Sequence, residues 1–292
     1  MPIPDLKPQS RLHGRSIFLS ASVPTPERSD EYDRIQEAPL RIEEAVVCVA
    51  RAIFMEGGTL VFGAHPSISP LVARVVDNYF LPAPAEDRQP STERDESEPS
   101  WKNPSVVIYQ SRVWEPYWAE ATQQLIRHPL VSVEWTDAEP GEFIDLKIKD
   151  RPQAPHSMRR MRETMIEETS PVAMIAIGGM KGVLDEAAVF NRLRPGAPIF
   201  TLETTGGAAA ILSRDPEYRN RVRVMDVEAE RLVRSFWEEQ KEQVERKEPR
   251  GAVRTDAGEP RQFYVPYVLV AQEIVAEIVR RPEDSPRQRS RW

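Results

Sequence analysis

Cysteine is nearly absent from this sequence, since Cys48 is the only one among 292 residues. A single thiol cannot form an intramolecular disulfide, and it cannot supply a cysteine cluster for zinc. The four histidines show no spacing typical of metal ligands, so we expect no metal site. No apolar run reaches the roughly 20 residues of a membrane span, and the N-terminus lacks the apolar core of a secretory signal. These absences predict a cytoplasmic protein that does not enter membranes.

An excess of positive charge is also lacking. The 39 Lys and Arg residues are outnumbered by 46 Asp and Glu residues, which gives a net charge of −7. Proteins that coat nucleic acid need a basic surface, so we expect no nucleic-acid partner. The sequence has no G-x-x-x-x-G-K-[ST] motif and no G-x-G-x-x-G motif after its first predicted strand. These gaps disfavour a P-loop ATPase and a NAD-dependent dehydrogenase, and we expect no resident cofactor.

Proline, by contrast, is abundant, with 27 residues. Residues 81–104 hold five of these prolines and many charges, with almost no apolar side chain before Trp101. Such a segment cannot bury enough surface to become ordered, so we predict a disordered insertion there. By similar reasoning, residues 1–15 are expected to form a flexible lead and residues 282–292 an Arg-rich tail.

Short apolar segments alternate with helical patterns along most of the chain. This alternation predicts an α/β, Rossmann-like, doubly wound parallel sheet of about six strands. The expected domain covers residues 16–213, and residues 214–281 are expected to form a helical C-terminal extension. We expect the strands to lie side by side in the order 106–110, 59–62, 16–23, 130–135, 172–177 and 199–202.

Ligands of such sheets bind beyond the carboxyl ends of the strands. Four loops at predicted strand ends are small, polar or rich in glycine, and two of them lead into helices. Glycines at a helix N-terminus expose backbone N–H groups that favour phosphate, although glycine is also the default residue of any tight turn. We predict a phosphate-bearing ligand, bound by Ser20, Ala21, Ser22, Gly63, Ala64, His65, Gly178, Gly179, Met180, Lys181, Gly182, Thr204, Thr205 and Gly206.

Three motifs carry a more specific signal: Val-Phe-Gly-Ala-His-Pro at 61–66, Ile-Gly-Gly-Met-Lys-Gly-Val-Leu-Asp-Glu at 177–186, and Thr-Thr-Gly-Gly-Ala-Ala at 204–209. Together they resemble the SLOG superfamily, which joins the Smf and DprA proteins with the "lonely guy" phosphoribohydrolases. The resemblance implies a nucleotide or nucleotide-derived ligand. The pattern is similar to SLOG branches of bacterial conflict systems, in which the domain senses a nucleotide signal.

The resemblance also implies roles for particular residues. Asp185 and Glu186 fall on the two carboxylates of the enzymes' loop, and Arg162 falls on an arginine of the preceding helix, with Arg159 one turn earlier. Ile177 replaces the enzymes' proline and Val183 their threonine. Two functions therefore stay open. One is a sensor that binds its ligand without turnover or with slow turnover, and the other is a nucleotide N-glycosidase that uses the catalytic set Glu186, Asp185 and Arg162.

The chemistry of the second function fits these residue types. Cleavage of an N-glycosidic bond passes through an oxocarbenium-like transition state, which needs a nearby carboxylate and a cation for the phosphate. A simpler alternative is that Asp185 and Glu186 only stabilise the first turns of their helix through its dipole. His65 has a similar pair of interpretations, because it could contact a ligand or cap the next helix.

The expected partners are a second copy of the chain and, for a sensor, a separate effector protein. SLOG relatives commonly pair through surface helices. The aromatic residues Trp114, Tyr117 and Trp118 and the Met-rich helix 154–168 offer apolar side chains for a homodimer or a larger assembly, although Met158, Met161 and Met165 also fit a stripe packed inside the protein.

Overall fold

A computed structural model describes residues 11–24, 32, 38–79, 105–118, 120–147, 153–247 and 265–281. The predicted insertion at 81–104, the first ten residues of the predicted lead and the predicted tail at 282–292 lie outside the described residues.

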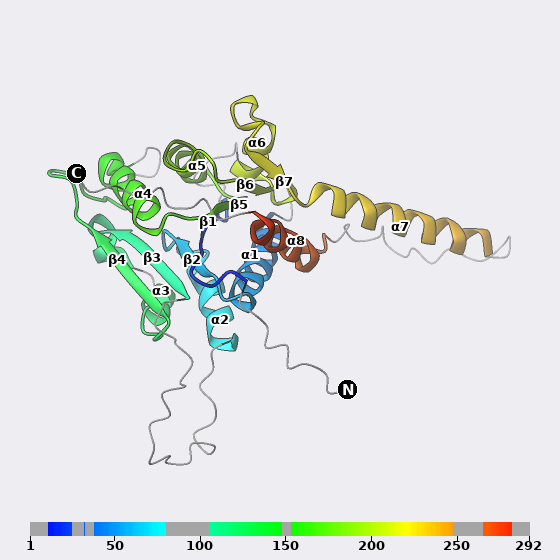
Figure 1. Ribbon diagram of the computed structural model, residues 1–292, viewed down its shortest axis with the longest axis horizontal. Helices are drawn as coiled ribbons and strands as arrows, with labels where there is room; N and C mark the ends of the chain where they lie inside the picture. The colour runs from blue at the N-terminus through cyan, green and yellow to red at the C-terminus, as the bar shows by residue number, and fades with distance from the viewer. Residues whose placement is uncertain are drawn as a thin grey trace, which may run out of the picture.

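Seven strands form one parallel sheet, in the order β4-β3-β2-β1-β5-β6-β7 (Figure 1). The predicted α/β, doubly wound class is confirmed. The strands are β1 (Ser16–Ser22), β2 (Thr59–Phe62), β3 (Val106–Ser111), β4 (Val131–Thr136), β5 (Ala173–Gly178), β6 (Ile199–Leu202) and β7 (Val222–Val224).

The predicted strand order is wrong at one place. We expected the strand near 130–135 between β1 and β5, but β4 pairs with β3 at the edge of the sheet, and β1 pairs directly with β5. The composition of the strands explains the difference. Alternate side chains of β4 are polar, as an edge strand tolerates, whereas all six residues of β5 are buried, as a central parallel strand requires.

β7 was not predicted, because three residues are too few to show a periodic pattern. It pairs with β6, so the sheet continues into the region after residue 213 that we expected to be only helical.

Helices cover both faces of the sheet and enclose two apolar cores. On one face lie α1 (Ala38–Met55), α2 (Ser69–Tyr79), α3 (Glu120–Leu125) and α8 (Tyr267–Arg280). On the other face lie α4 (Pro155–Thr169), α5 (Lys181–Leu193) and α6 (Gly207–Arg214). The connections among the described residues include the 3₁₀ helices η2 (Arg112–Tyr117), η3 (Glu203–Thr205) and η4 (Pro216–Tyr218).

The described end of the predicted flexible lead is packed. The side chain of Leu12 is fully buried in the core beside α1, and its N–H donates to the carbonyl of Glu56 at 2.8 Å. Arg11 forms an ion pair with the Glu56 carboxylate. Leu12 therefore anchors this end of the predicted lead to the core.

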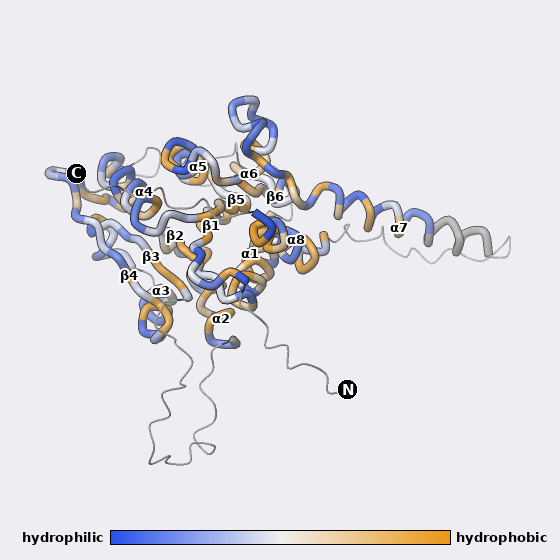
Figure 2. Tube along the Cα trace, viewed as in Figure 1, coloured by the Kyte–Doolittle hydropathy of each residue, from blue (hydrophilic) through white to orange (hydrophobic). Residues whose placement is uncertain are grey.

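The helix α7 (Val227–Lys247) projects from the rest of the molecule, and apolar residues recur along it (Figures 1 and 2). Leu232, Phe236 and Trp237 are each more than half exposed. In contrast, Met161 and Met165 on α4 are buried in the core, and Trp118 stacks on Trp135 at 4.7 Å between ring centroids. The exposed aromatic pair Phe236 and Trp237 therefore lies on α7, whereas Met161 and Met165 are internal.

No helix in the described part of the chain has the length and apolar character needed to span a membrane.

Candidate functional site

The switch point of the sheet lies between β1 and β5. From β1 the chain continues outward through β2, β3 and β4, and it then returns to β5 on the other side of β1. Ser22 and Gly178, the last residues of β1 and β5, are paired in register at the carboxyl edge of the sheet, where the strands end. In doubly wound sheets this is the place where ligands bind.

The three candidate catalytic residues meet at this edge. The hydroxyl of Ser20 on β1 donates to Oε2 of Glu186 on α5. The Arg162 side chain comes from α4, and its Nε lies 3.7 Å from Oε1 of Glu186. Its Nη1 lies 3.7 Å from Oδ2 of Asp185. We call Ser20, Arg162, Asp185 and Glu186 the carboxylate–arginine cluster.

This cluster is largely shielded from solvent. The side chains of Glu186 and Arg162 are 15% and 13% exposed. Burial raises the pKa of Glu186, while the charge of Arg162 and the hydrogen bond from Ser20 oppose this rise. Nε of Arg162 is buried and has no hydrogen-bond partner among the described residues. An unpaired buried donor is rare in folded proteins and is open to an acceptor from a ligand.

Two glycines border the cluster. A Cβ placed on Gly63 would lie 3.5 Å from Cε of Met161 and 3.9 Å from Oε1 of Glu186. A Cβ placed on Gly182 would lie 3.6 Å from Nη2 of Arg162. Both positions therefore leave space next to the buried charges, which a side chain would fill.

The glycine loop after β5 is tied to the protein. Gly178 and Gly179 have φ of +56° and +86°, a region that glycine adopts without strain. The N–H of Gly178 donates to Oγ1 of Thr205 at 2.8 Å, and the N–H of Gly179 donates to the carbonyl of Ser22 at 2.8 Å. Both N–H groups therefore already have acceptors within the fold.

The donors that stay available lie slightly further along the chain. Lys181 and Gly182 are in the first turn of α5, where N–H groups have no acceptor within the helix. The positive end of the helix dipole lies at the same place. A Cβ on Gly182 would approach Nη2 of Arg162, so the helix terminus and the guanidinium can act on one anion.

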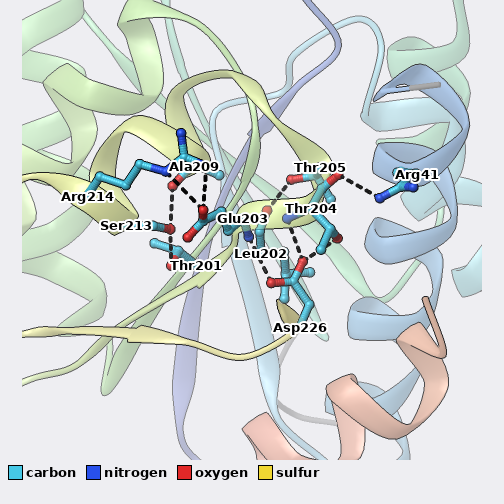
Figure 3. Close-up of polar contacts among 10 residues, drawn as sticks. All are labelled: Arg41, Thr201, Leu202, Glu203, Thr204, Thr205, Ala209, Ser213, Arg214 and Asp226. Carbon is cyan, nitrogen blue, oxygen red and sulfur yellow. Dashed lines mark hydrogen bonds and ion pairs between the residues drawn. The ribbon is translucent and has the colours of Figure 1, made fainter. Parts of the chain in front are cut away.

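The turn after β6 has its hydroxyl groups engaged within the protein (Figure 3). Oγ1 of Thr204 bonds with Asp226 and, at 2.8 Å, with the hydroxyl of Tyr267. Oγ1 of Thr205 donates to the carbonyl of Leu202 at 2.5 Å. Gly206 donates its N–H to the carbonyl of Glu203. The visible role of Thr204, Thr205 and Gly206 is to shape this turn.

Three other candidates lie apart from the cluster or at its surface. Nδ1 of His65 is 2.8 Å from Oγ of Ser67, which also accepts the N–H of Val23. Arg159 is 67% exposed and pairs with Glu163, and Lys181 is 63% exposed and pairs with Asp185.

The remaining candidates are small residues in the same loops. Ala21 packs against the apolar core, and Ala64 adopts a positive φ of +51°. Met180 precedes the first turn of α5 in an extended conformation.

Sequence reasoning missed Asp226 and Tyr267, which support the turn after β6. The only local signal was an aspartate before a helix, as expected of a helix N-cap. Within the described ranges, no group of three or more His, Cys, Asp or Glu side chains could hold a metal ion.

Comparisons with known proteins found a family match and a similar solved structure. Residues 100–236 match the model of the SLOG cluster3 family. Among solved structures, the chain is similar to the X-ray structure of TM1055, a structural genomics target, with 14% identity and a TM-score of 0.39. That match covers 72% of this chain and 90% of TM1055. No curated protein matches the chain.

Proposed function

We propose that the chain binds a nucleotide or nucleotide-derived signal molecule at the carboxylate–arginine cluster, because residues 100–236 match the SLOG cluster3 family model. The observation that carries the proposal is the buried Nε of Arg162, which makes no hydrogen bond among the described residues and lies beside the first turn of α5. A buried guanidinium N–H that still lacks a hydrogen bond can donate to an anionic ligand group.

The two ends of such a ligand would meet different groups. A phosphate fits the N–H groups of Lys181 and Gly182, the helix dipole and the Arg162 guanidinium. The Glu186 carboxylate is an acceptor for sugar hydroxyls, since it can take further hydrogen bonds besides the one from Ser20. Gly63, which has no side chain, lies beside Glu186 where that part of the ligand would bind.

We favour a sensor in bacterial defence or stress signalling over an enzyme. Ile177 and Val183 stand where the similar enzymes have proline and threonine. A sensor transmits binding to another protein, so this function predicts a separate effector whose association with the chain depends on the nucleotide.

The second candidate is a nucleotide N-glycosidase, and the contact of Glu186 with Ser20 and Arg162 favours it. In that reaction water attacks C1′ of the ribose, and the glycosidic bond breaks with its electron pair leaving on the base. The base then takes up a proton. An ionised Glu186 can stabilise the positive charge on the sugar or accept a proton from the water.

One experiment separates the two candidates. Small molecules released from purified, heat-denatured protein are identified by mass spectrometry, and a nucleotide panel is tested for binding and for free base. A sensor binds without releasing base, and Glu186→Gln changes its affinity modestly. An N-glycosidase releases base, and Glu186→Gln abolishes release while binding persists. If the panel shows neither binding nor base release, the proposed function is wrong.

We also propose that the chain forms a homodimer through α7. Phe236 and Trp237, whose ring centroids lie 6.0 Å apart, are both more than half exposed, as is Leu232. Aromatic residues of this kind are enriched at the centres of protein interfaces. In sedimentation, Phe236→Glu should convert a dimer to a monomer. Leu40→Glu, at an exposed position of α1, should not. A wild-type monomer at micromolar concentration would contradict the proposal.

A further inference from the structure

A buried carboxylate outside the carboxylate–arginine cluster lies behind the ligand loop. Asp226 is fully buried and directly precedes α7. It accepts the N–H groups of Glu203 and Thr204, each at 2.9 Å, and the hydroxyl of Thr204 at 2.5 Å (Figure 3). All three bonds go to the turn after β6, so this one side chain is a major anchor of the turn.

The turn is in contact with the glycine loop after β5 at three points. Oγ1 of Thr205 accepts the N–H of Gly178, and the N–H of Ala208 donates to the carbonyl of Gly179 at 2.9 Å. Gly207 comes so close that a Cβ on it would lie 2.4 Å from the carbonyl oxygen of Gly179. A displacement of the turn must therefore displace the glycine loop, which leads into α5.

Charged and titratable groups from four elements surround Asp226. Arg41 on α1 donates to the carbonyl of Thr204 at 3.3 Å and pairs with Glu230 on α7 at 3.2 Å. Tyr267 on α8 bonds the Thr204 hydroxyl, and Glu203 belongs to η3. Among the residues that the structure describes, no cation is paired directly with Asp226. Its hydrogen-bonding capacity is thus directed to the turn.

We infer that Asp226 is a positioning residue for the ligand site. By fixing the turn after β6, it holds Gly178 and Gly179 in place and sets the first turn of α5 against Arg162. The geometric part of this inference concerns the loop alone, and the consequence for binding rests on the proposed function. Asp226 itself lies outside the ligand-binding surface, but the conformation of that surface depends on it.

Amide hydrogen exchange of the full chain without nucleotide tests the geometric part. Asp226→Asn replaces an acceptor oxygen with an NH₂ group, and Thr205→Val removes the acceptor of Gly178. Both variants should speed exchange in peptides covering 176–183 by about 10-fold or more, since local opening becomes easier. Thr205→Ser keeps a hydroxyl and should restore the wild-type rate. Ser213→Ala, which removes bonds to Thr201 and Ala209 on the same side of the turn, is the matched control.

Faster exchange confined to peptides covering the turn and the glycine loop would support the inference. Unchanged exchange at 176–183 in both Asp226→Asn and Thr205→Val would overturn it, and so would a uniform increase over all peptides. If Asp226→Asn does not fold, the comparison of Thr205→Val with Thr205→Ser decides the matter.

Calorimetry with AMP tests the consequence for binding. Asp226→Asn should weaken AMP binding about 10-fold, although Asp226 does not belong to the carboxylate–arginine cluster. Unchanged AMP affinity in a variant with faster loop exchange would overturn the positioning role. If wild-type protein and the nucleotide panel show no binding at all, the proposed function fails, while the exchange result still decides whether Asp226 holds the loop.

Discussion

Two buried carboxylates, Glu186 and Asp226, lie near the same edge of the sheet but have different partners. Burial raises the pKa of both. Asp226 accepts two backbone N–H groups and one hydroxyl, so its oxygens are well satisfied. Glu186 accepts one hydroxyl, from Ser20, and lies 3.7 Å from an arginine nitrogen that itself has no hydrogen bond.

The comparison separates two uses of a buried charge. A carboxylate whose hydrogen bonds are complete holds the fold in place, and removing it leaves several donors without partners. A carboxylate and an arginine whose hydrogen bonds are incomplete have capacity left for a ligand. A related contrast applies to the glycines, since a Cβ on Gly207 would overlap backbone atoms, whereas a Cβ on Gly63 would make ordinary contacts with the side chains of Met161 and Glu186.

The largest effect on stability is expected from Gly207→Ala. Its φ is +57°, and the new Cβ would lie 2.4 Å from the carbonyl oxygen of Gly179. Backbone strain and overlap together should cost about 2–4 kcal/mol of unfolding free energy. Gly63→Ala places its Cβ 3.5 Å from Met161 and should change stability little. Urea unfolding of both variants checks this contrast, and equal losses would contradict it.

A smaller difference in unfolding free energy is expected between substitutions of the two carboxylates. Asp226→Asn should lower the unfolding free energy by about 1–3 kcal/mol, because an amide cannot accept all three hydrogen bonds. Glu186→Gln should cost less, since only the Ser20 bond is exchanged and an amide oxygen can accept it. Chemical denaturation of the two variants provides the measurement. A greater loss for Glu186→Gln would reverse the assignment of the two roles.

The pH dependence of stability should show the smallest effect. Burial raises the pKa of Asp226 from 3.8 to about 6. The folded state therefore binds a proton at a pH where the unfolded state has released it. The contribution of this group to the unfolding free energy falls as pH rises toward 6 and is then constant.

Relative to Asp226→Asn, the wild type should thus gain about 1 kcal/mol of unfolding free energy when pH is lowered from 7 to 5. Denaturation curves of both proteins at the two pH values measure this difference. No change in the difference, or a change of opposite sign, would show that the Asp226 carboxyl is not desolvated in the fold.

Local sequence patterns were sufficient to predict the class of the fold. Continuous apolar segments such as 172–177 predicted buried parallel strands, and β5 is buried throughout. The order of the strands was harder, because it depends on which strand forms the edge. The alternation of polar residues in β4, Val-Ser-Val-Glu-Trp-Thr, is the sequence pattern that marks it as an edge strand.

The proximity of some candidate site residues was predicted from the sequence. The resemblance brought Arg162, Asp185 and Glu186 together, and the structure places them within ion-pair distance. The bonds of Gly178 to Thr205 and of Thr204 to Tyr267 join residues 27 and 63 positions apart. Periodicity and spacing report on neighbours in sequence, so contacts of this kind between strand ends could not be predicted from them.

The account depends most on Arg162 as the ligand-binding cation, and calorimetry of two arginine variants tests it directly. A charge-assisted hydrogen bond contributes about 1.5–3 kcal/mol, so Arg162→Ala should weaken nucleotide binding by about 10- to 150-fold. Arg160→Ala, on the same helix but 51% exposed and paired with Glu139, should leave the affinity unchanged. Equal affinities of the wild type and of folded Arg162→Ala would contradict the account and place the nucleotide elsewhere.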